Sequence, residues 1–200
     1  MEFENKEGIL AVQISRDAVT EYLKEHRVKV PENVPDKFKM KTGVFTTISS
    51  YPSKELRGCI GFPEPIYPLI EALVKSAIYA ATEDPRFMPV EYDELDHLVF
   101  EVSLLTPPSL ISINDPEDYF NIIKIGQDGL IAELGGMRGL LLPQVPVENS
   151  WDIKTYLIET CLKAGLSPSC WKNKNVRFYK FSGTIFEETE PKGTIVKKRI

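Results

Sequence analysis

The feature that most constrains the fold of this chain is that strand-like segments come in pairs joined by turns, with isolated helical segments between the pairs. The first pair begins with Val44 to Ile48, where β-branched and aromatic side chains favour a strand. We expect one hairpin from residues 43–48 and 56–60 and another from residues 129–134 and 138–142, around Gly135-Gly136. Paired strands without regular strand–helix alternation predict an α+β fold with antiparallel sheets and flanking helices.

Three segments carry apolar residues at helical spacing: 7–25, 67–82 and 151–164. Pro85 ends the second, because the residue before a proline is pushed out of the α region. For the third helix we expect Ser150 as the N-cap and Asp152 in the first turn. Gly165 then suits the position after its C-terminal end.

The remaining segments give weaker signals. Residues 98–105 are apolar on both faces, apart from Glu101 and Ser103, which predicts a central strand. Residues 176–187 are expected to form a last long strand or a bulged pair around Gly183, residues 26–41 and 143–149 to be connections, and residues 109–126 to be mixed.

Composition excludes several protein classes. Two hundred residues are enough for one large domain or two small ones, and 42% hydrophobic with 26% charged residues is ordinary for a globular chain. The net charge of −5 argues against broad binding of nucleic acid by phosphate neutralisation. The apolar runs are too short to span a membrane, and the acidic, polar N-terminus does not resemble a targeting segment. The basic run Lys197–Arg199 is expected to be a solvated end.

The three cysteines are Cys59, Cys161 and Cys170. An odd number without a C-x-x-C motif predicts reduced thiols and a cytoplasmic protein. No cysteine and histidine pair has the spacing of zinc ligands, so no metal site is expected, and no motif identifies a cofactor. His26 and His97 are expected to be structural or solvated rather than catalytic.

The residues that could carry reactive chemistry occur together in one hexapeptide, Leu56-Arg57-Gly58-Cys59-Ile60-Gly61. In a strand, Arg57 and Cys59 would share a face, and a neighbouring cation favours the nucleophilic thiolate. Gly58 and Gly61 would let a ligand or another backbone approach closely. Three interpretations stay open: a reactive cysteine, an anion site built on Arg57 and backbone N–H groups, and a small buried cysteine at a tight strand end.

Two further groups carry charge at places where a site could form. In Asp84-Pro85-Arg86-Phe87, Arg86 could bind a phosphate or carboxylate while Asp84 holds it or exchanges protons. The alternative is a structural clip in which Asp84 pairs with Arg86 and Phe87 fills the core. Glu101, alone in an apolar strand, needs a partner, for which we expect an arginine.

Several of these strings resemble those of the AMME-syndrome candidate-gene (AMMECR-type) domain family. They are Gly43–Thr47, Leu56–Gly61, Ala80-Ala81, Asp84–Phe87, Ser103–Pro107, Leu141–Val145, Trp151 and Lys163–Leu166, in the family's order. The resemblance implies a single AMMECR-type domain over residues 1–200, with two packed subdomains. The larger subdomain would hold both termini and the smaller would be inserted.

The resemblance also implies where function lies. The family has no firmly established activity, and the hexapeptide is usually suggested as its functional site. Related domains occur fused to or beside Memo-like and radical S-adenosylmethionine proteins, which implies work beside a modification enzyme. That link is association rather than mechanism.

Two functional hypotheses follow. The first is a binding or accessory module with an anion-accepting cleft for a small anionic ligand or a partner protein, formed by Arg57, Gly58, Gly61, Asp84 and Arg86. It is preferred because neither histidine shows a motif linking it to the thiol as a base. The second is a thiol-dependent enzyme in which Cys59 is the nucleophile. Under a third, purely structural interpretation the hexapeptide only shapes a tight turn.

Overall fold

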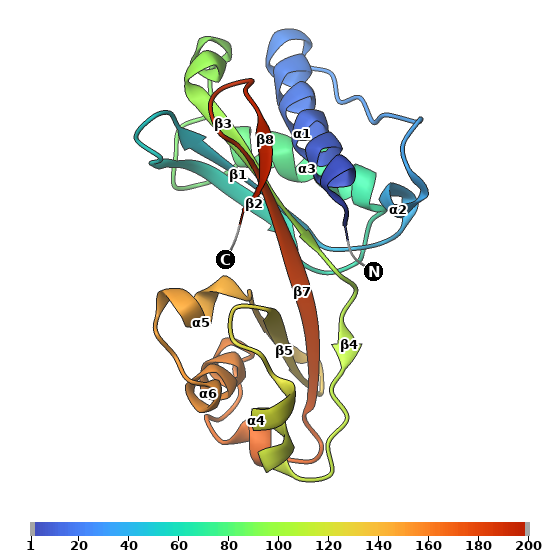
Figure 1. The fold of residues 1–200 in the computed structure, drawn as a ribbon, viewed down its shortest axis with the longest axis vertical. Coiled ribbons are helices and arrows are strands. Elements are labelled where there is room, and N and C mark those ends of the chain that lie inside the picture. The colour runs from blue at the N-terminus through green and yellow to red at the C-terminus, as the bar shows by residue number, and fades with distance from the viewer. Residues whose placement is uncertain (1–2, 199–200) are drawn as a thin grey trace. The chain divides into compact units, whose positions relative to one another are not determined.

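Helices and antiparallel strands make up the computed structural model of the chain, which describes residues 3–198 (Figure 1). The helices are α1 (Asn5–Glu25), α2 (Asp36–Lys39), α3 (Leu69–Thr82), α4 (Tyr119–Ile122), α5 (Gln144–Glu148) and α6 (Ile153–Lys163). The strands are β1 (Val44–Ser50), β2 (Leu56–Phe62), β3 (Leu98–Leu105), β4 (Ser109–Leu110), β5 (Asp128–Leu134), β6 (Met137–Leu141), β7 (Arg177–Glu188) and β8 (Ile195–Lys198). Short 3₁₀ helices occur at Tyr92–His97, Pro116–Asp118 and Cys170–Lys172. The predicted α+β class is confirmed.

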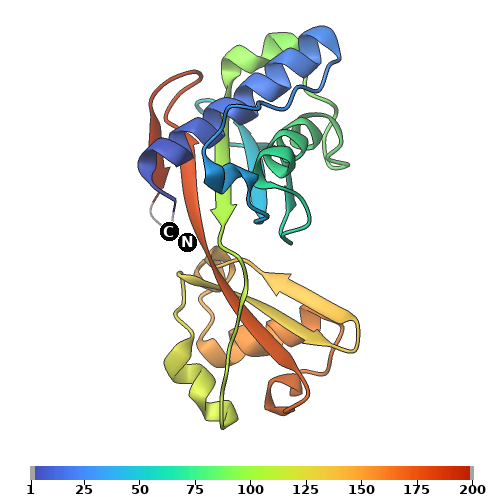
Figure 2. The same cartoon turned by 90° about the vertical axis from the view of Figure 1, so that its right-hand side faces the viewer.

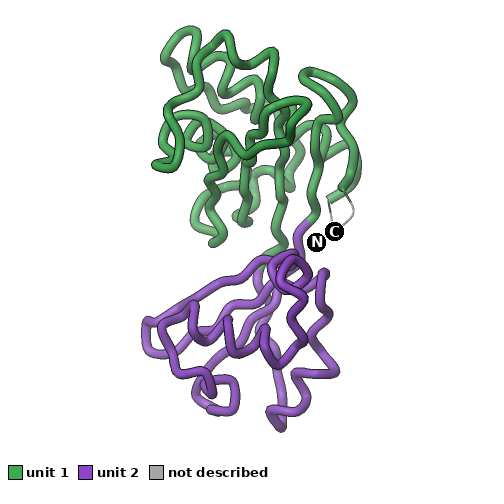
Figure 3. The backbone as a smooth tube through the Cα atoms, turned by 90° about the vertical axis from the view of Figure 1, so that its left-hand side faces the viewer, with its two compact units in different colours: residues 1–107, 184–199 green, residues 108–183, 200 purple. Residues whose placement is uncertain are grey.

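The chain divides into two compact units (Figure 3). Unit 1 holds the chain up to Pro107 and again from Thr184, and unit 2 runs from Pro108 to Gly183. Strand β7 contributes residues to each unit. The packing of two subdomains against each other, which the family resemblance implies, stays a prediction, and each unit is described by itself.

The sheet of unit 1 has the strand order β2-β1-β3-β7, and β8 also pairs with β7. The pairs β1–β2, β1–β3 and β7–β8 are antiparallel. Thr47 on β1 lies opposite Cys59 on β2 and opposite Glu101 on β3. The predicted hairpin of residues 43–48 with 56–60 and the predicted central strand 98–105 are confirmed.

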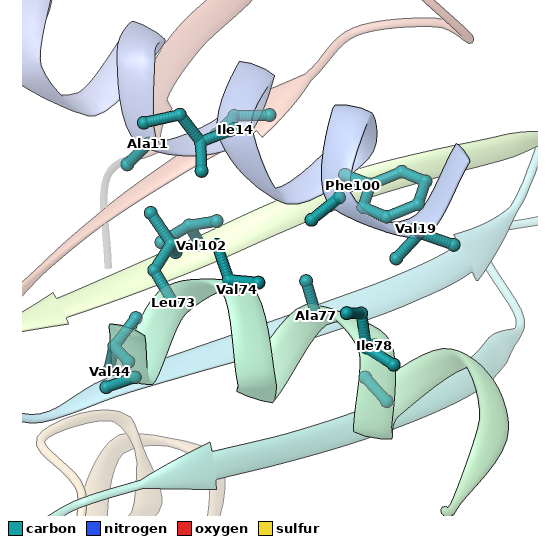
Figure 4. Close-up of a cluster of buried hydrophobic side chains, with 14 of the residues drawn as sticks. Ala11, Ile14, Val19, Val44, Leu73, Val74, Ala77, Ile78, Phe100 and Val102 are labelled. Atoms are coloured by element: carbon teal, nitrogen blue, oxygen red, sulfur yellow. The ribbon is translucent and has the colours of Figure 1, made fainter. Parts of the chain in front are cut away.

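Helices α1 and α3 pack on one face of this sheet (Figure 2). In a strand, alternate side chains point to the same face, so Phe100, Val102 and Leu104 all face the helices and are fully buried. Figure 4 shows side chains of both helices gathered in one cluster with side chains of the sheet: Ala11, Ile14 and Val19 of α1, Leu73, Val74 and Ala77 of α3, and Val44, Phe100 and Val102 of β1 and β3. Burying each large apolar side chain contributes about 1.5–3 kcal/mol, so this layer holds unit 1 together.

A buried ion pair crosses the same core. The Arg16 guanidinium on α1 donates to both carboxylate oxygens of Glu188 on β7, at 2.6 and 2.5 Å. Arg16 also donates to the Leu98 carbonyl at 2.6 Å, and the Phe100 amide donates to Glu188 at 3.0 Å. Because both charges are buried and hydrogen-bonded, the pair fixes how α1 lies on the sheet.

Unit 2 is built on the strand order β7-β5-β6, and β4 also pairs with β7. The predicted hairpin of β5 and β6 is confirmed, with Gly135 and Gly136 at φ 55° and 89°, angles that glycine adopts without strain. Tyr156 of α6 is fully buried, and its hydroxyl donates to the carbonyls of Asp128 and Leu141 at 3.1 Å each. These bonds tie α6 to the end of each strand.

The prediction of three reduced cysteines is wrong. Cys161 at the end of α6 and Cys170 in the last 3₁₀ helix form a disulfide across a sequence separation of 9, and only Cys59 is free. The spacing matches no motif, and the two residues meet because the chain turns back after Gly165. The loop closed by the bridge fixes the Cys170–Lys172 helix against α6.

Several local predictions also need correction. The N-cap of α6 is Asp152, whose carboxylate accepts from the Thr155 amide at 2.7 Å, whereas Ser150 has φ 54° outside the helix. The two predicted connections contain the short helices α2 and α5. Of the two alternatives for residues 176–187, the single long strand is confirmed, over residues 177–188. Gly165 follows the helix with φ 73°, as predicted.

In its described part the basic C-terminal run is exposed to solvent, as predicted, and it forms a strand. Lys197 and Lys198 lie in β8 opposite Phe186 and Ile185 of β7, while Arg199 lies outside the described residues. Residues 3–198 include no helix long and apolar enough to cross a membrane.

Candidate functional site

Cys59 lies on the face of the sheet opposite the helices. Its neighbour Gly58 faces α3, and side chains alternate along a strand, so the Cys59 thiol points away from α3. The Thr47 hydroxyl on the adjacent strand donates to the Cys59 sulfur at 3.3 Å. Cys59 is partly exposed and is the only free cysteine among the described residues. The thiol is therefore reachable and reduced.

The two glycines of the hexapeptide lie in close contact with the protein itself. A Cβ atom at Gly58 would collide with the Ala80 carbonyl of α3, and one at Gly61 would collide with the Phe45 ring. Gly58 thus lets β2 approach the end of α3, which is the close backbone approach considered from the sequence. A role for either glycine as a ligand contact stays a prediction.

Asp84 joins the hexapeptide Leu56–Gly61 to the segment Asp84–Phe87. It follows the end of α3, and its carboxylate accepts from the Cys59 amide at 2.9 Å. It also accepts from Nε and a terminal nitrogen of Arg86, at 2.9 and 2.6 Å, and from the Arg86 amide at 3.2 Å. These bonds, those from the Arg86 side chain most of all, hold the pKa of Asp84 far below its ordinary value although burial opposes this. Asp84 is thus a fixed anion at neutral pH rather than a proton donor.

Arg86 is held at one edge and exposed at the other. Its side chain is 54% exposed, while that of its partner Asp84 is 2% exposed. One terminal nitrogen, already bonded to Asp84, lies 3.4 Å from the Cys59 carbonyl. The Asp84 carboxylate, and to a smaller degree Cys59, raise the pKa of Arg86, so its positive charge is permanent. Arg86 therefore presents an oriented cation beside the hexapeptide.

Arg57 is held by the loop that follows α3. Its guanidinium donates to both carboxylate oxygens of Glu94, at 3.0 and 2.8 Å, and to the carbonyls of Met88 and Pro89, at 2.6 and 3.2 Å. Hydrogen bonding to Arg57 lowers the pKa of Glu94. These four hydrogen bonds direct Arg57 to the loop after α3, so the expected Arg57–thiol contact gives way to a clamp between β2 and that loop.

The other candidates make contacts of their own. The Glu101 carboxylate pairs with Lys198 at 2.7 Å, so the partner is a lysine and not the expected arginine. His26 caps the end of α1, and its ring meets that of Tyr22 edge-on at 6.0 Å. His97 ends a 3₁₀ helix, and its carbonyl accepts from the Tyr51 amide. Within residues 3–198, no group of three or more histidine, cysteine, aspartate or glutamate side chains could hold a metal ion.

The geometry adds two residues that sequence reasoning did not single out. Thr47 contacts the thiol because β1 and β2 pair in that register, and Glu94 reaches Arg57 across 37 residues of sequence. Neither has a local motif that points to these roles. Asp84 and Arg86 thus contact the backbone of Cys59, while Thr47 contacts its sulfur.

Comparison with known proteins finds close relatives over the whole chain. A family model described as AMMECR1 matches residues 12–186. Protein MJ0810 of Methanocaldococcus jannaschii is 53% identical over 195 residues, which cover 98% of this chain and 96% of that protein. Protein PH0010 of Pyrococcus horikoshii is 52% identical over 195 residues, covering 96% and 94% of the two chains. The crystal structure of the uncharacterized protein PH0010 matches with a TM-score of 0.85 and 50% identity over 100% of both chains.

Proposed function

Because the chain belongs to the AMMECR1 family, we propose that it is a binding or accessory module that receives an anionic group at the Leu56–Gly61 strand through Arg86. The ligand is a phosphate or carboxylate carried by a small molecule or by a modified side chain. We also propose that the protein assists a modification enzyme of the Memo-like or radical S-adenosylmethionine type, as the family resemblance implies.

One observation carries this proposal: a buried carboxylate, Asp84, binds the Cys59 backbone and orients a half-exposed arginine. The guanidinium edge that Asp84 does not occupy remains available for a second oxyanion. Arginine binds carboxylate and phosphate groups in a planar fork, and charge-assisted hydrogen bonds of this kind are roughly twice as strong as neutral ones. Because Asp84 already holds the Arg86 side chain in place, less conformational entropy is lost when a ligand binds.

Anion binding at this position can be tested by thermal shift with inorganic phosphate, acetate and phosphoserine as probes. A ligand that binds only the folded state raises stability by RT ln(1 + [L]/Kd). We expect at least one probe to stabilise the wild type and to lose that effect in Arg86→Gln.

The matched control is Arg27→Gln, which removes a surface arginine whose side chain is 81% exposed. The control should respond to the probes like the wild type. If Arg86→Gln and Arg27→Gln respond alike, or if no probe stabilises the wild type, the proposal fails.

The alternative is a thiol-dependent enzyme in which Cys59 is the nucleophile. It is favoured because Cys59 is free and partly exposed, and because a terminal nitrogen of Arg86 lies 3.4 Å from the Cys59 carbonyl oxygen. Under this alternative Cys59 would react with iodoacetamide at neutral pH much faster than glutathione does, because the thiolate is the reactive form. A rate equal to that of glutathione would leave the binding module as the better account.

A further inference from the structure

Unit 2 contains a cavity of about 320 Å³, remote in sequence from the hexapeptide. One wall is the segment from Leu110 to Pro116, the other is the segment from Trp171 to Phe178, and Tyr119 completes the lining. Cavities of this size fall at the lower end of those that hold small ligands. The cavity is therefore large enough for one compact molecule.

Both walls are fixed by the fold. The Ile111 amide donates to the Phe178 carbonyl at 2.8 Å, which continues the pairing of β4 with β7. Trp171 lies in the 3₁₀ helix that begins at Cys170, and the disulfide to Cys161 joins that helix to α6. A site built on restrained elements loses little entropy when a ligand binds.

The apolar part of the cavity is aromatic. Tyr119, Trp171 and Phe178 all line it, and each is almost completely buried. The rings of Tyr119 and Phe178 lie 5.2 Å apart, and Phe120 meets Trp171 edge-on at 5.9 Å. The Lys172 ammonium also lies 5.1 Å from the centre of the Trp171 ring. Because the rings are buried against these neighbours, they form an apolar floor against which a flat, apolar ligand body can lie.

The charged part of the cavity is positive only. Lys172, Lys174 and Arg177 line it, and no aspartate or glutamate does. Arg177 pairs with Glu133 outside the lining at 2.5 Å, while Lys172 and Lys174 make no ion pair among the described residues. Three cations beside a cavity without carboxylates attract an anion, although the chain as a whole carries a net charge of −5.

Acidic residues lie beside the cavity but outside its lining, and they keep their negative charge. Asp115, Glu117 and Asp118 follow one another along the chain at the end of the first wall, but none of them lines the cavity. The carboxylate of Asp118 accepts from the amides of Asn114 and Asp115, and that of Asp115 accepts from the Glu117 amide. These two carboxylates are thus engaged by the backbone of their own turn.

We propose that this cavity is a binding site for a small aromatic anion, with the ring against Tyr119, Trp171 and Phe178 and the phosphate or carboxylate at Lys172 and Lys174. The site is independent of Arg86 and of the function proposed for the hexapeptide. Nucleic acid is a poorer occupant, because the cavity has room for a single compact molecule and the chain has no net positive charge.

Calorimetric titration of the full chain with phenyl phosphate and adenosine 5′-monophosphate tests this proposal. At least one of the two should bind saturably, while adenosine and inorganic phosphate, which lack either the charge or the ring, should bind at least about tenfold more weakly, a difference of about 1.4 kcal/mol. No saturable binding of either aromatic phosphate, or equal binding of the fragments, would overturn it.

Variants then locate the binding. The double variant Lys172→Gln/Lys174→Gln should weaken it at least about tenfold, since hydrogen bonds to charged groups are stronger than neutral ones. Ser112→Phe, at an exposed residue of the lining, should block the cavity while retaining all three cations. The control Lys154→Gln, at an exposed lysine of α6 outside the lining, should leave it unchanged. Binding that resists both cavity variants would contradict the assignment.

Discussion

Arg57 and Arg86 each pair with a carboxylate, but the two pairs differ in which partner is buried. In the pair of Arg57 with Glu94, the arginine side chain is 17% exposed and the carboxylate side chain 37% exposed. In the pair of Arg86 with Asp84, the arginine is 54% exposed and the carboxylate 2%. The cation is thus the more buried partner in the first pair and the more exposed partner in the second.

This reversal is the reason we assign Arg57 to structure and propose Arg86 for anion binding. Arg57 uses its guanidinium to clamp β2 to the loop after α3, and four hydrogen bonds within the protein direct it there. Arg86 is oriented by a carboxylate that also holds the Cys59 amide, so its free edge faces outward beside the hexapeptide. A cation that is both fixed and exposed is suited to recognition.

Removing the buried carboxylate should have the largest effect on stability. Asp84→Ala deletes a charged acceptor and leaves the Cys59 amide without its partner. We expect the free energy of unfolding to fall by about 3 kcal/mol, since bonds to charged groups are strong and an orphaned buried donor is costly. Urea unfolding measures the loss. A fall comparable to that of Arg86→Gln alone would break the comparison, because Asp84 would then serve only Arg86.

The close approach of β2 to α3 explains how Asp84 reaches the Cys59 amide. In Gly58→Ala the new methyl group would collide with the Ala80 carbonyl, which is backbone and cannot turn aside. Overpacking of this kind costs about 1–3 kcal/mol, to be measured by urea unfolding. The control is Gly193→Ala, where the methyl group meets the flexible side chain of Glu190, and a smaller loss is expected. Equal losses would show that the approach is not tight.

Arg57→Ala should destabilise the protein less than either change. Glu94 and the Met88 and Pro89 carbonyls lie near solvent and regain water when the guanidinium is removed. We expect a loss of about 1–2 kcal/mol in urea unfolding. A loss close to zero would contradict the assignment of Arg57 to structure.

The smallest expected effect is on acid stability. The pKa of Asp84 is lowered in the folded state from its ordinary 3.8, so its contribution is fully present above that value and is lost only as the pH falls through the lowered pKa. The stability difference between wild type and Asp84→Asn should be constant from about pH 5 to 8 and shrink below about pH 4. Urea unfolding across this range measures the difference. A difference that instead shrinks toward pH 7 would place the carboxyl pKa near neutrality.

The sequence predicted what depends on local pattern. Apolar spacing located the helix that became Leu69–Thr82, and an apolar run located the central strand Leu98–Leu105. Gly135 and Gly136 marked a hairpin correctly, because their angles are almost confined to glycine. These features depend on residues close in sequence, where propensity and periodicity operate.

The sequence could not predict contacts set by packing. Asp84 and Arg86 were recognised as a pair because they are two residues apart, but the bond from the Cys59 amide to Asp84 requires α3 to lie against β2. The partner of Arg57 is Glu94, and that of Glu101 is Lys198, 97 residues away. Many residues of opposite charge could have been these partners, and the sequence does not say which one packing brings close. The disulfide of Cys161 with Cys170 was missed because no motif marks it.

The central claim, that Arg86 and not Arg57 presents the usable positive charge beside Cys59, is tested most directly by the ratio of alkylation rates with iodoacetate and iodoacetamide. The two reagents differ in charge, and among the described residues only Cys59 carries a free thiol. We predict that Arg86→Gln lowers the ratio roughly three- to tenfold, as expected for loss of one charge near a surface, while Arg57→Gln and Arg27→Gln change it little. A ratio that falls more in Arg57→Gln than in Arg86→Gln, or that is unchanged in Arg86→Gln, would contradict the account.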